Sequence, residues 1–452
     1  MNRTPRIASF AMAAALALMA GSALGSQAPA QAPAQGQEAG KQQYTMAEYN
    51  SYQACAAEKN PQAQIKCLDD FVAKYPNSAL LIYVYPLYYN AYSQLKNFTK
   101  VIEYADKLIA LGDKVELPVR YQAYYARAFA YSNLQNEPIA KDPAQAQKAR
   151  EAALAGLKTL GELKKPDNMS QEEFDKQKQQ PTILFNYTAG IAAMNAKDYQ
   201  GAVDSFKAVL ALNPDDAITA YKIGQAYMAM NPPQQLDAFW YFAKAVAKNQ
   251  NQQQAAQVKS YLRKLIANYQ GGNVCDSIVD AELNELLQLA STSADRPASY
   301  SIPSAADLDN ARKDMTMRSV IADLQAGGDK AKITWMAACG LEFPDVPGKL
   351  LEVTPSGDSV VLKVGFVTSD AEFEAKNTPD MEVKIVGQPE AARLEKDNPV
   401  RFTATLESYT PDPFMLHFDK GKVNAEDIPK EKEKKAPTKK RPTKRPAAGS
   451  RH

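Results

Sequence analysis

The sequence has very few of the residues that hold metals and cofactors. Its 452 residues include two histidines, two tryptophans and four cysteines. His417 and His452 are the only histidines, and no Cys-x-x-Cys motif occurs, which argues against a zinc or haem site. We therefore expect no metal and no cofactor.

Motifs that mark common catalytic centres are also missing. The chain lacks G-x-S-x-G, H-E-x-x-H, a Walker loop and G-x-G-x-x-G. Acidic pairs such as Asp69-Asp70 and Asp215-Asp216 are expected at helix surfaces or turns, where solvation and helix capping explain them. We predict that the protein is not an enzyme. A hydrolase stays a third hypothesis, because a glycosidase needs only two carboxylates.

Long apolar runs are absent except for one near the start. Residues 8–20 are apolar, but this run is shorter than the roughly 20 residues that a membrane-spanning helix needs. Arg3 and Arg6 precede it, and the small residues of a cleavage site follow at 23–25. The pattern predicts a bacterial secretory signal peptide over residues 1–25, and export to the periplasm or the exterior.

Charge is nearly balanced overall but is unevenly placed. Residues 430–452 hold ten Lys or Arg against two Glu, so the rest of the chain is at about −6, the total of +2 less the +8 of this tail. The tail lacks large apolar residues, and we predict that it is disordered. The Pro/Ala/Gln-rich linker at residues 26–43 is predicted to be disordered too.

The basic tail indicates an anionic partner. After an export signal, envelope polymers or phospholipid headgroups are favoured over nucleic acid, held by an attraction that salt weakens. A solvated tail that only keeps the protein soluble stays an alternative.

Two stretches in the middle of the chain repeat at a spacing of 34 residues, the distance between Gly190 and Gly224. Small, aromatic and proline positions also correspond: Ala202, Phe206 and Pro214 in the first copy, and Ala238, Phe242 and Ala245 in the second. A period near 34 with these residue types predicts antiparallel helix pairs stacked into a solenoid. On these residues the chain resembles the tetratricopeptide repeat family.

The residue types suit close packing of helices. Gly190 and Gly224 are expected where the first helix of a pair presses on the second, with Ala202 and Ala238 facing them, because bulky side chains would keep the helices apart. The predicted packing residues also include three larger side chains that fill the space between pairs: Phe206, Tyr227 and Phe242.

The repeat region is predicted to cover residues 44–270 as five helix pairs and a capping helix. The polar stretch at 161–180 fits either a loop or an extended helix end. Residues 271–332 are predicted to be a helical connector, in which Gly327 and Gly328 end a helix.

A concave groove is the predicted partner-binding surface of these repeats. Matching the chain to the family pattern places seven side chains in it: Tyr83, Asn90, Gln122, Tyr125, Tyr187, Tyr221 and Gln225. The alternative is that the tyrosines only fill gaps between helices. Some family members hold a peptide's terminal carboxylate with Asn and Lys, but the matching positions here include Ile191 and Met194, so the resemblance does not imply that clamp.

The four cysteines suit an oxidising compartment. Cys55 and Cys67 stand on either side of a turn at Asn60-Pro61, so they could form a disulfide between two antiparallel helices. Cys275 and Cys339 would pair only if the segment after the repeats folds back on the β-rich part. Four small buried thiols stay the alternative.

The last third of the chain changes to alternating apolar and polar residues. Five candidate strands lie within the predicted β-rich domain, residues 333–429, with a possible short helix between the third and fourth. This pattern resembles a small OB-like barrel, and a five-stranded sandwich is the alternative. The predicted fold is thus mainly α: a helix-pair solenoid followed by a small five-stranded β domain.

Two functions are compatible with this organisation. We expect an exported scaffold or adaptor that binds a protein or peptide partner in the groove of its repeats. The alternative is an OB-like protein that binds an anionic polymer, a glycan or a nucleic acid, with the repeats as an oligomerisation arm.

Overall fold

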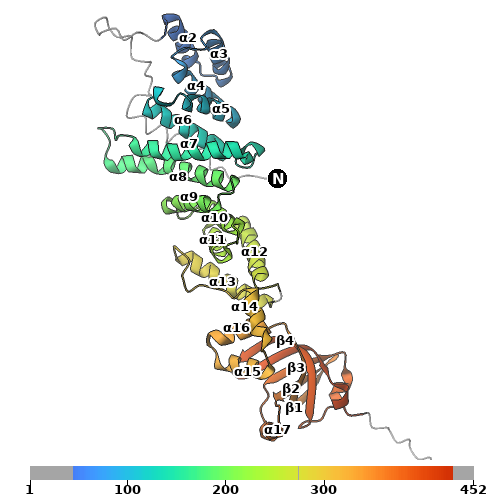
Figure 1. Ribbon diagram of the computed structural model, residues 1–452. Coiled ribbons are helices and arrows are strands. Elements are labelled where there is room, and N and C mark those ends of the chain that lie inside the picture. The colour runs from blue at the N-terminus through green and yellow to red at the C-terminus, as the bar shows by residue number, and fades with distance from the viewer. Residues whose placement is uncertain (1–43, 273, 431–452) are drawn as a thin grey trace, which may run out of the picture. The chain divides into compact units, whose positions relative to one another are not determined.

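The computed structural model describes residues 44–272 and 274–430 (Figure 1). This part of the chain contains sixteen α-helices and five β-strands. They belong to two compact units, Met1–Ile266 with Ala281–Ile302, and Ala267–Asp280 with Pro303–His452. The predicted signal peptide, the predicted linker and residues 431–452 of the basic tail lie outside the described residues.

The first unit is mainly helical, and its helices follow one another in pairs. The pairs are α2 (Met46–Ala57) with α3 (Pro61–Lys74), α4 (Leu81–Gln94) with α5 (Phe98–Ile109), α6 (Leu117–Asn133) with α7 (Pro143–Glu162), α8 (Gln171–Asn195) with α9 (Tyr199–Leu212), and α10 (Ala217–Ala229) with α11 (Gln235–Lys248). From α2 to α11 each helix packs on the next, and α6 also packs on α4 and α8. Two further helices, α12 (Gln252–Tyr269) and α13 (Asp276–Thr292), follow.

The turns inside the second and fourth pairs have the same local structure. Lys96 and Lys197 both adopt the left-handed conformation, with φ of 58° and 61°. The next residue, Asn97 or Asp198, caps the following helix by accepting a hydrogen bond from the backbone N–H three residues on. Similar short sequences thus give one turn, as expected of a repeated unit.

Close contact within two of the pairs depends on glycine. A Cβ atom on Gly190 would lie 2.5 Å from the ring of Phe206, and one on Gly224 would lie 2.8 Å from the ring of Phe242. The ring, and not the expected alanine, is therefore the nearest neighbour of each glycine. All seven predicted packing residues are buried: Gly190, Ala202, Phe206, Gly224, Tyr227, Ala238 and Phe242.

Helix α8 extends well before the repeat. Ser170 and Glu173 form a capping box at its start, in which the Ser170 hydroxyl accepts from the Glu173 N–H at 3.2 Å and Glu173 accepts from the Ser170 N–H at 3.0 Å. Residues 171–180, which fitted either a loop or a helix end, therefore belong to α8.

A disulfide joins the first two helices of this unit. Cys55 of α2 and Cys67 of α3 are bonded, with their Cα atoms 5.4 Å apart. Asn60 caps α3 by accepting from the N–H groups of Gln62 and Ala63, both at 3.0 Å. This cap and Pro61 at the first position of α3 fix the turn that brings the two cysteines together.

The second unit contains a closed five-stranded barrel. Its strands are β1 (Glu342–Ser356), β2 (Ser359–Phe366), β3 (Met381–Val386), β4 (Pro399–Pro411) and β5 (Phe414–Val423). They hydrogen-bond in the order β1-β2-β3-β5-β4, and the barrel closes between β4 and β1. Only β3 and β5 run parallel to each other. The closed barrel rules out the sandwich, and a short 3₁₀ helix, Pro389–Arg393, lies where a short helix was expected.

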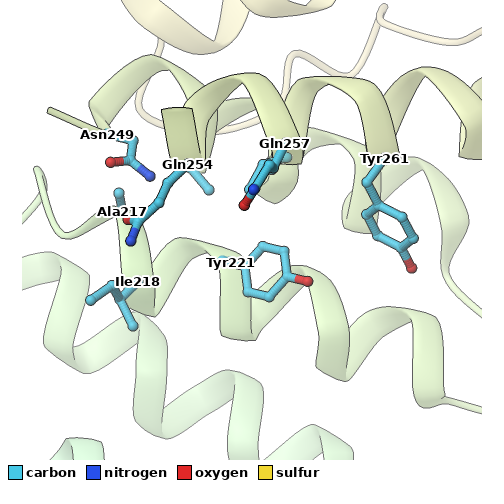
Figure 2. A pocket seen from close by; sticks show the side chains of 9 residues that line it. Ala217, Ile218, Tyr221, Asn249, Gln254, Gln257 and Tyr261 are labelled. Atoms are coloured by element: carbon cyan, nitrogen blue, oxygen red, sulfur yellow. The ribbon is translucent and has the colours of Figure 1, made fainter. Parts of the chain in front are cut away.

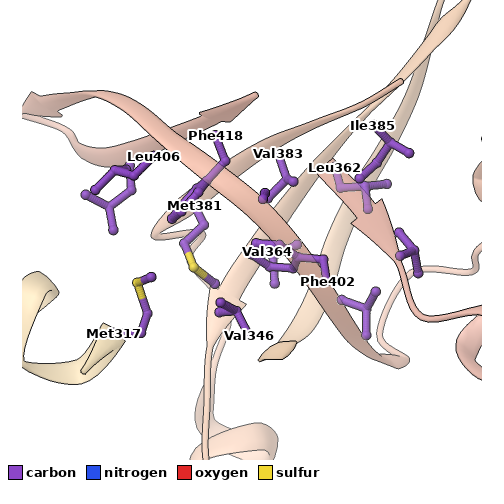
Figure 3. Packing of buried hydrophobic residues seen from close by; sticks show 14 of the residues in the cluster. Met317, Val346, Leu362, Val364, Met381, Val383, Ile385, Phe402, Leu406 and Phe418 are labelled. Carbon is purple, nitrogen blue, oxygen red and sulfur yellow. The ribbon is translucent and has the colours of Figure 1, made fainter. Parts of the chain in front are cut away.

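Alternating side chains of the strands fill the barrel. Val360, Leu362 and Val364 of β2 are buried, as their spacing predicts. Phe402 and Phe418 pack edge to face, with ring centroids 5.7 Å apart. Figure 3 shows Leu362, Val364, Phe402 and Phe418 together with Met317, which comes from a helix beside the barrel.

Three helices precede the barrel: α14 (Ala305–Lys313), α15 (Met317–Ala326) and α16 (Gly328–Ala338). Gly328 therefore begins a helix, contrary to the prediction that it ends one. Because α16 continues to Ala338, the β-rich part begins at Glu342, and the predicted boundary at residue 333 was too early. Three residues of α16 pack on the barrel core, Ala331 and Ala338 within it and Trp335 against it.

The second disulfide lies within this unit. Cys275 and Cys339 are bonded, with their Cα atoms 5.9 Å apart. Cys339 is fully buried beside Leu308, Met336 and Ala337. The segment before α13 is thus covalently attached to the end of α16, which is the folding back that this pairing required.

Candidate partner-binding site

A hollow of about 350 Å³ lies between α10 and α12. Figure 2 shows Gln257 of α12 above the ring of Tyr221 on α10, and Gln254 of α12 extending toward Ala217. The complete lining consists of Ala217, Ile218 and Tyr221 from α10, Ala245 and Asn249 from the end of α11, and Gln254, Gln257, Val258 and Tyr261 from α12.

Local sequence places these side chains on common helix faces. Asp216 caps α10 by accepting from the N–H groups of Ile218 at 3.0 Å and Thr219 at 3.1 Å. The helix starts there, so Ala217, Ile218 and Tyr221 share one face. On α12 the lining positions 254, 257, 258 and 261 follow the spacing of three and four that gives one side of a helix.

Two tyrosine rings line the hollow, Tyr221 on α10 and Tyr261 on α12. Phe242 of α11 lies between two tyrosines, with its ring centroid 5.3 Å from Tyr221 and 5.4 Å from Tyr261. Burial raises the pKa of Tyr221, and the neighbouring Tyr261 raises it further. The Tyr221 hydroxyl therefore stays protonated at neutral pH and can donate a hydrogen bond.

Charged groups next to the hollow do not line it. Lys248, at the end of α11, pairs with Asp215 at 2.8 Å. Burial lowers the pKa of the Lys222 amine, and Asp216 opposes that shift. All nine lining side chains are uncharged at neutral pH. The hollow therefore offers hydrogen bonds and apolar contact but no ionic attraction.

The predicted groove residues divide by exposure. Tyr83, Asn90 and Gln225 are exposed, and Gln122 and Tyr221 are half-buried. Of these, only Tyr221 lines the hollow. Tyr83 lies elsewhere, with its ring 6.2 Å from that of Tyr52 on α2.

Two predicted groove residues were wrong. Tyr125 is only 5% exposed and Tyr187 only 9%, so neither is available to a partner. Tyr125 packs edge to face on Phe185 of α8, with centroids 6.1 Å apart, and Tyr187 packs on Phe206 of α9 at 5.9 Å. Aromatic side chains of the next helices cover both tyrosines, which is the gap-filling role that the sequence left as the alternative.

The sequence reading missed the α12 side of the hollow. Gln254, Gln257 and Tyr261 belong to a helix that was expected only to cap the stack with a polar outer face. Their spacing of three and seven residues was visible in the sequence, but it could not show which neighbouring helix this face would meet.

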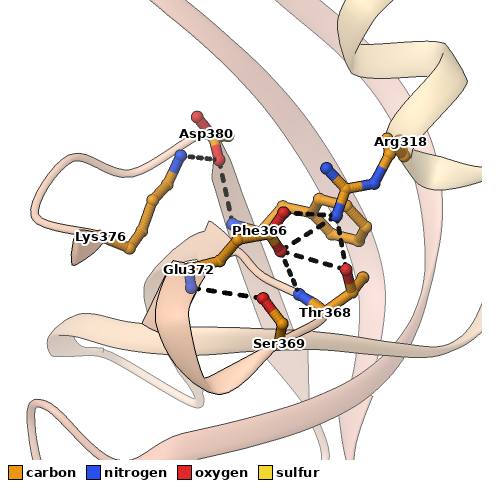
Figure 4. Close-up of polar contacts among 7 residues, drawn as sticks. All are labelled: Arg318, Phe366, Thr368, Ser369, Glu372, Lys376 and Asp380. Atoms are coloured by element: carbon orange, nitrogen blue, oxygen red, sulfur yellow. Dashed lines mark hydrogen bonds and ion pairs between the residues drawn. The ribbon is translucent and has the colours of Figure 1, made fainter. Parts of the chain in front are cut away.

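A second, polar cluster lies in the barrel unit (Figure 4). Arg318 of α15 donates to Glu372 of the short helix α17 (Asp370–Ala375) at 2.8 Å, and its guanidinium lies 5.5 Å from the ring centroid of Phe366. Lys376 pairs with Asp380, which also accepts from the Phe366 N–H at 3.0 Å. The two acids and two bases neutralise each other, so this cluster holds α17 in place.

The described residues were also compared with two other kinds of site, metal centres and membrane-spanning helices. Among residues 44–272 and 274–430, no three His, Cys, Asp or Glu side chains are grouped so that they could hold a metal ion. Within the same described ranges, every helix is too short or too polar to cross a membrane.

Comparison with known proteins does not place the chain in a family. No protein-family model matches it, and no curated protein matches its sequence significantly. The structure itself provides a helical, repeat-like region and a closed five-stranded barrel. The tetratricopeptide resemblance stays a prediction.

Proposed function

We propose that the protein is a non-catalytic exported scaffold or adaptor that binds a protein or peptide partner through the hollow between α10 and α12. The observation that carries this proposal is the lining of the hollow, which combines the rings of Tyr221 on α10 and Tyr261 on α12 with three side-chain amides. Tyrosine provides a large contact area with few rotatable bonds, and amides pair with peptide groups.

The helix pairs are proposed to form a tetratricopeptide-like solenoid. Two features support this: the shared turn at Lys96 and Lys197, and the glycine–phenylalanine contact that recurs at Gly190 and Gly224. In such a fold the concave side is the usual partner surface. The basic tail would add a salt-sensitive contact with an anionic envelope polymer or lipid.

The first test compares two tyrosines of equal exposure. Tyr261 lines the hollow and Tyr83 does not, yet both are 42% exposed. Full-length chain, its Tyr261→Ala variant and its Tyr83→Ala variant are used to capture partners from envelope extract after crosslinking. We expect Tyr261→Ala to lose at least about tenfold in capture, as hot-spot tyrosines do, and Tyr83→Ala to retain it. Equal capture by all three would refute the proposed site.

The barrel supports a second candidate function. Its strand order, with β3 parallel to β5, is the order expected of an OB-like barrel, a fold that often binds oligonucleotides or oligosaccharides on the face of strands two and three. The outward side of these strands argues against this function, however. Lys363 pairs with Glu352 at 2.9 Å and Lys384 lies 3.9 Å from Asp419, so neither lysine is free for an anionic polymer.

Heparin retention separates these two functions. Full-length chain is compared with a variant that ends at Lys430 and therefore lacks most of the basic tail. The adaptor proposal predicts that retention is lost with the tail, because the barrel lysines are already paired. Retention that survives removal of the tail would favour the barrel as the binding domain, through lysines other than Lys363 and Lys384.

A further inference from the structure

The polar groups that line the α10–α12 hollow are amides and phenol hydroxyls. Asn249, Gln254 and Gln257 contribute side-chain amides, and Tyr221 and Tyr261 contribute phenol hydroxyls. The other lining residues are alanine, isoleucine and valine. The lining offers a charged group no ionic partner, whereas it offers hydrogen bonds to the N–H and C=O groups of a peptide.

The acid and the base near the end of α11 do not provide the hollow with an unpaired charge. Asp215 and Lys248 already pair with each other at 2.8 Å. A carboxylate on the ligand would have to compete with Asp215 for Lys248, and a cation would have to compete with Lys248 for Asp215. The hollow therefore offers no ionic attraction to either sign of charge.

The row of side chains on α12 has the length of a short extended peptide. Positions 254 to 261 span seven residues of helix, or about 10 Å at 1.5 Å per residue. Three residues of extended polypeptide cover about the same distance. Each residue of such a segment brings an N–H and a C=O that need partners once water is displaced. Glutamine and asparagine offer both a donor and an acceptor on one side chain.

We propose that the occupant of this hollow is an uncharged, extended segment of the partner protein, whose backbone pairs with Gln254 and Gln257 while its small apolar side chains contact the tyrosine rings. This inference rests on the proposed function and makes it more specific. Recognition of this kind is insensitive to salt, because no ion pair is formed.

The test uses peptides of defined charge and the full-length chain. An immobilised array carries three sets of 12-residue peptides with matched Ala and Pro content: uncharged Gln-rich peptides, acidic peptides with Glu in place of Gln, and basic peptides with Lys in place of Gln. Residues 26–37 of the chain itself, SQAPAQAPAQGQ, provide one uncharged sequence. We expect binding to the uncharged set, unchanged by raising the salt concentration.

A pair of variants shows whether the hollow is responsible. Gln257→Glu replaces the amide donors with a second acceptor and adds a charge, so we expect it to weaken binding of the uncharged set by about tenfold or more. Gln252→Glu is the matched control, because Gln252 is exposed on the same helix but does not line the hollow. We expect the control variant to bind like the parent chain.

Each remaining outcome contradicts the inference. Preference for the acidic or the basic set, binding that weakens with salt, equal loss in the two variants, or no binding by any set would each overturn it. The proposed function fails separately, since it requires that capture of partner protein depends on Tyr261. A chain whose capture depends on Tyr261 but which prefers charged peptides would retain the function and lose this inference.

Discussion

At the residue scale, the spacing of paired helices depends on whether a glycine carries a side chain. Gly190 has the ring of Phe206 where its Cβ would lie, at 2.5 Å. We predict that Gly190→Ala lowers the free energy of unfolding by about 1–3 kcal/mol, because the added methyl group forces the ring or the helix to move. Urea unfolding followed by circular dichroism measures this change.

Gly161 is the matched control for that substitution. It also lies in a helix, α7, but a Cβ there would meet no atom within 4 Å. Gly161→Ala is therefore expected to raise stability by about 0.5 kcal/mol through helix propensity alone. A destabilising effect of equal size at both positions would show that the contact with Phe206 is not the cause.

Some residue-scale features could not be predicted from sequence. Arg127 is 1% exposed, and its charge is met by Asp106, which comes from the preceding helix. An arginine in a helix of mostly apolar and aromatic residues gives no sign of this partner. Tyr125 and Tyr187 failed as groove residues for the same reason, since the rings that cover them come from other helices.

At the scale of elements, the first helix pair depends on its disulfide. Cys55 and Cys67 close a short loop between α2 and α3, and within residues 44–272 these two helices pack on one neighbouring pair. We predict that the Cys55→Ala/Cys67→Ala double variant loses about 3 kcal/mol of stability, as loop-closure entropy estimates for a loop of this size.

The same experiment contains its own control. Adding reductant should lower the stability of the parent chain through the loss of both disulfides. The double variant should lose only the contribution of the Cys275–Cys339 disulfide. If the double variant unfolds at the same denaturant concentration as the parent, the bond does not contribute to stability.

The helices and strands were the most predictable features of this structure. The fourth and fifth helix pairs follow from small and aromatic residues at a period of 34, the first three follow from apolar residues at helical spacing, and the five strands follow from alternation between turn residues. Boundaries were harder, as α16 shows. The residues of α16 are compatible with a helix, but glycine at position 328 is typical of a helix end. The sequence alone therefore does not show whether a helix stops or starts at this position.

At the scale of the molecule, the first unit contains many buried tyrosines, and this gives it a defined response to pH. Burial raises the pKa values of Tyr89, Tyr121, Tyr125 and Tyr187, and it raises that of Tyr104 to about 12. These residues ionise near pH 10 in the unfolded chain. Below pH 10 these tyrosine hydroxyls are protonated in both the folded and the unfolded chain. Just above pH 10 they stay protonated only in the folded chain.

The contribution of these tyrosines to the stability of the unit should therefore be constant up to about pH 10 and should fall as the pH rises further. Measuring phenolate absorbance and circular dichroism together tests this prediction. We expect the buried tyrosines to ionise in the same step in which the helices unfold. Complete ionisation with the helices still intact would contradict it.

The hollow between α10 and α12 was the least predictable feature of the structure. The hollow combines α10 with α12, which belong to a repeat and to its predicted cap, and only one of its lining residues, Tyr221, was foreseen. Sequence periodicity identifies the face that each helix presents but not the face that it meets, so a surface shared by two helices appears only in the structure.

The central claim is that a partner protein occupies this hollow, and site-specific photo-crosslinking tests it most directly. A photoreactive residue is placed at position 257 of the full-length chain and, as the control, at position 252 of the same helix. The account predicts one specific crosslinked protein from position 257 and none from position 252, with the crosslink competed by uncharged peptide. The same products from both positions, or none from position 257 while the partner is still captured, would contradict it.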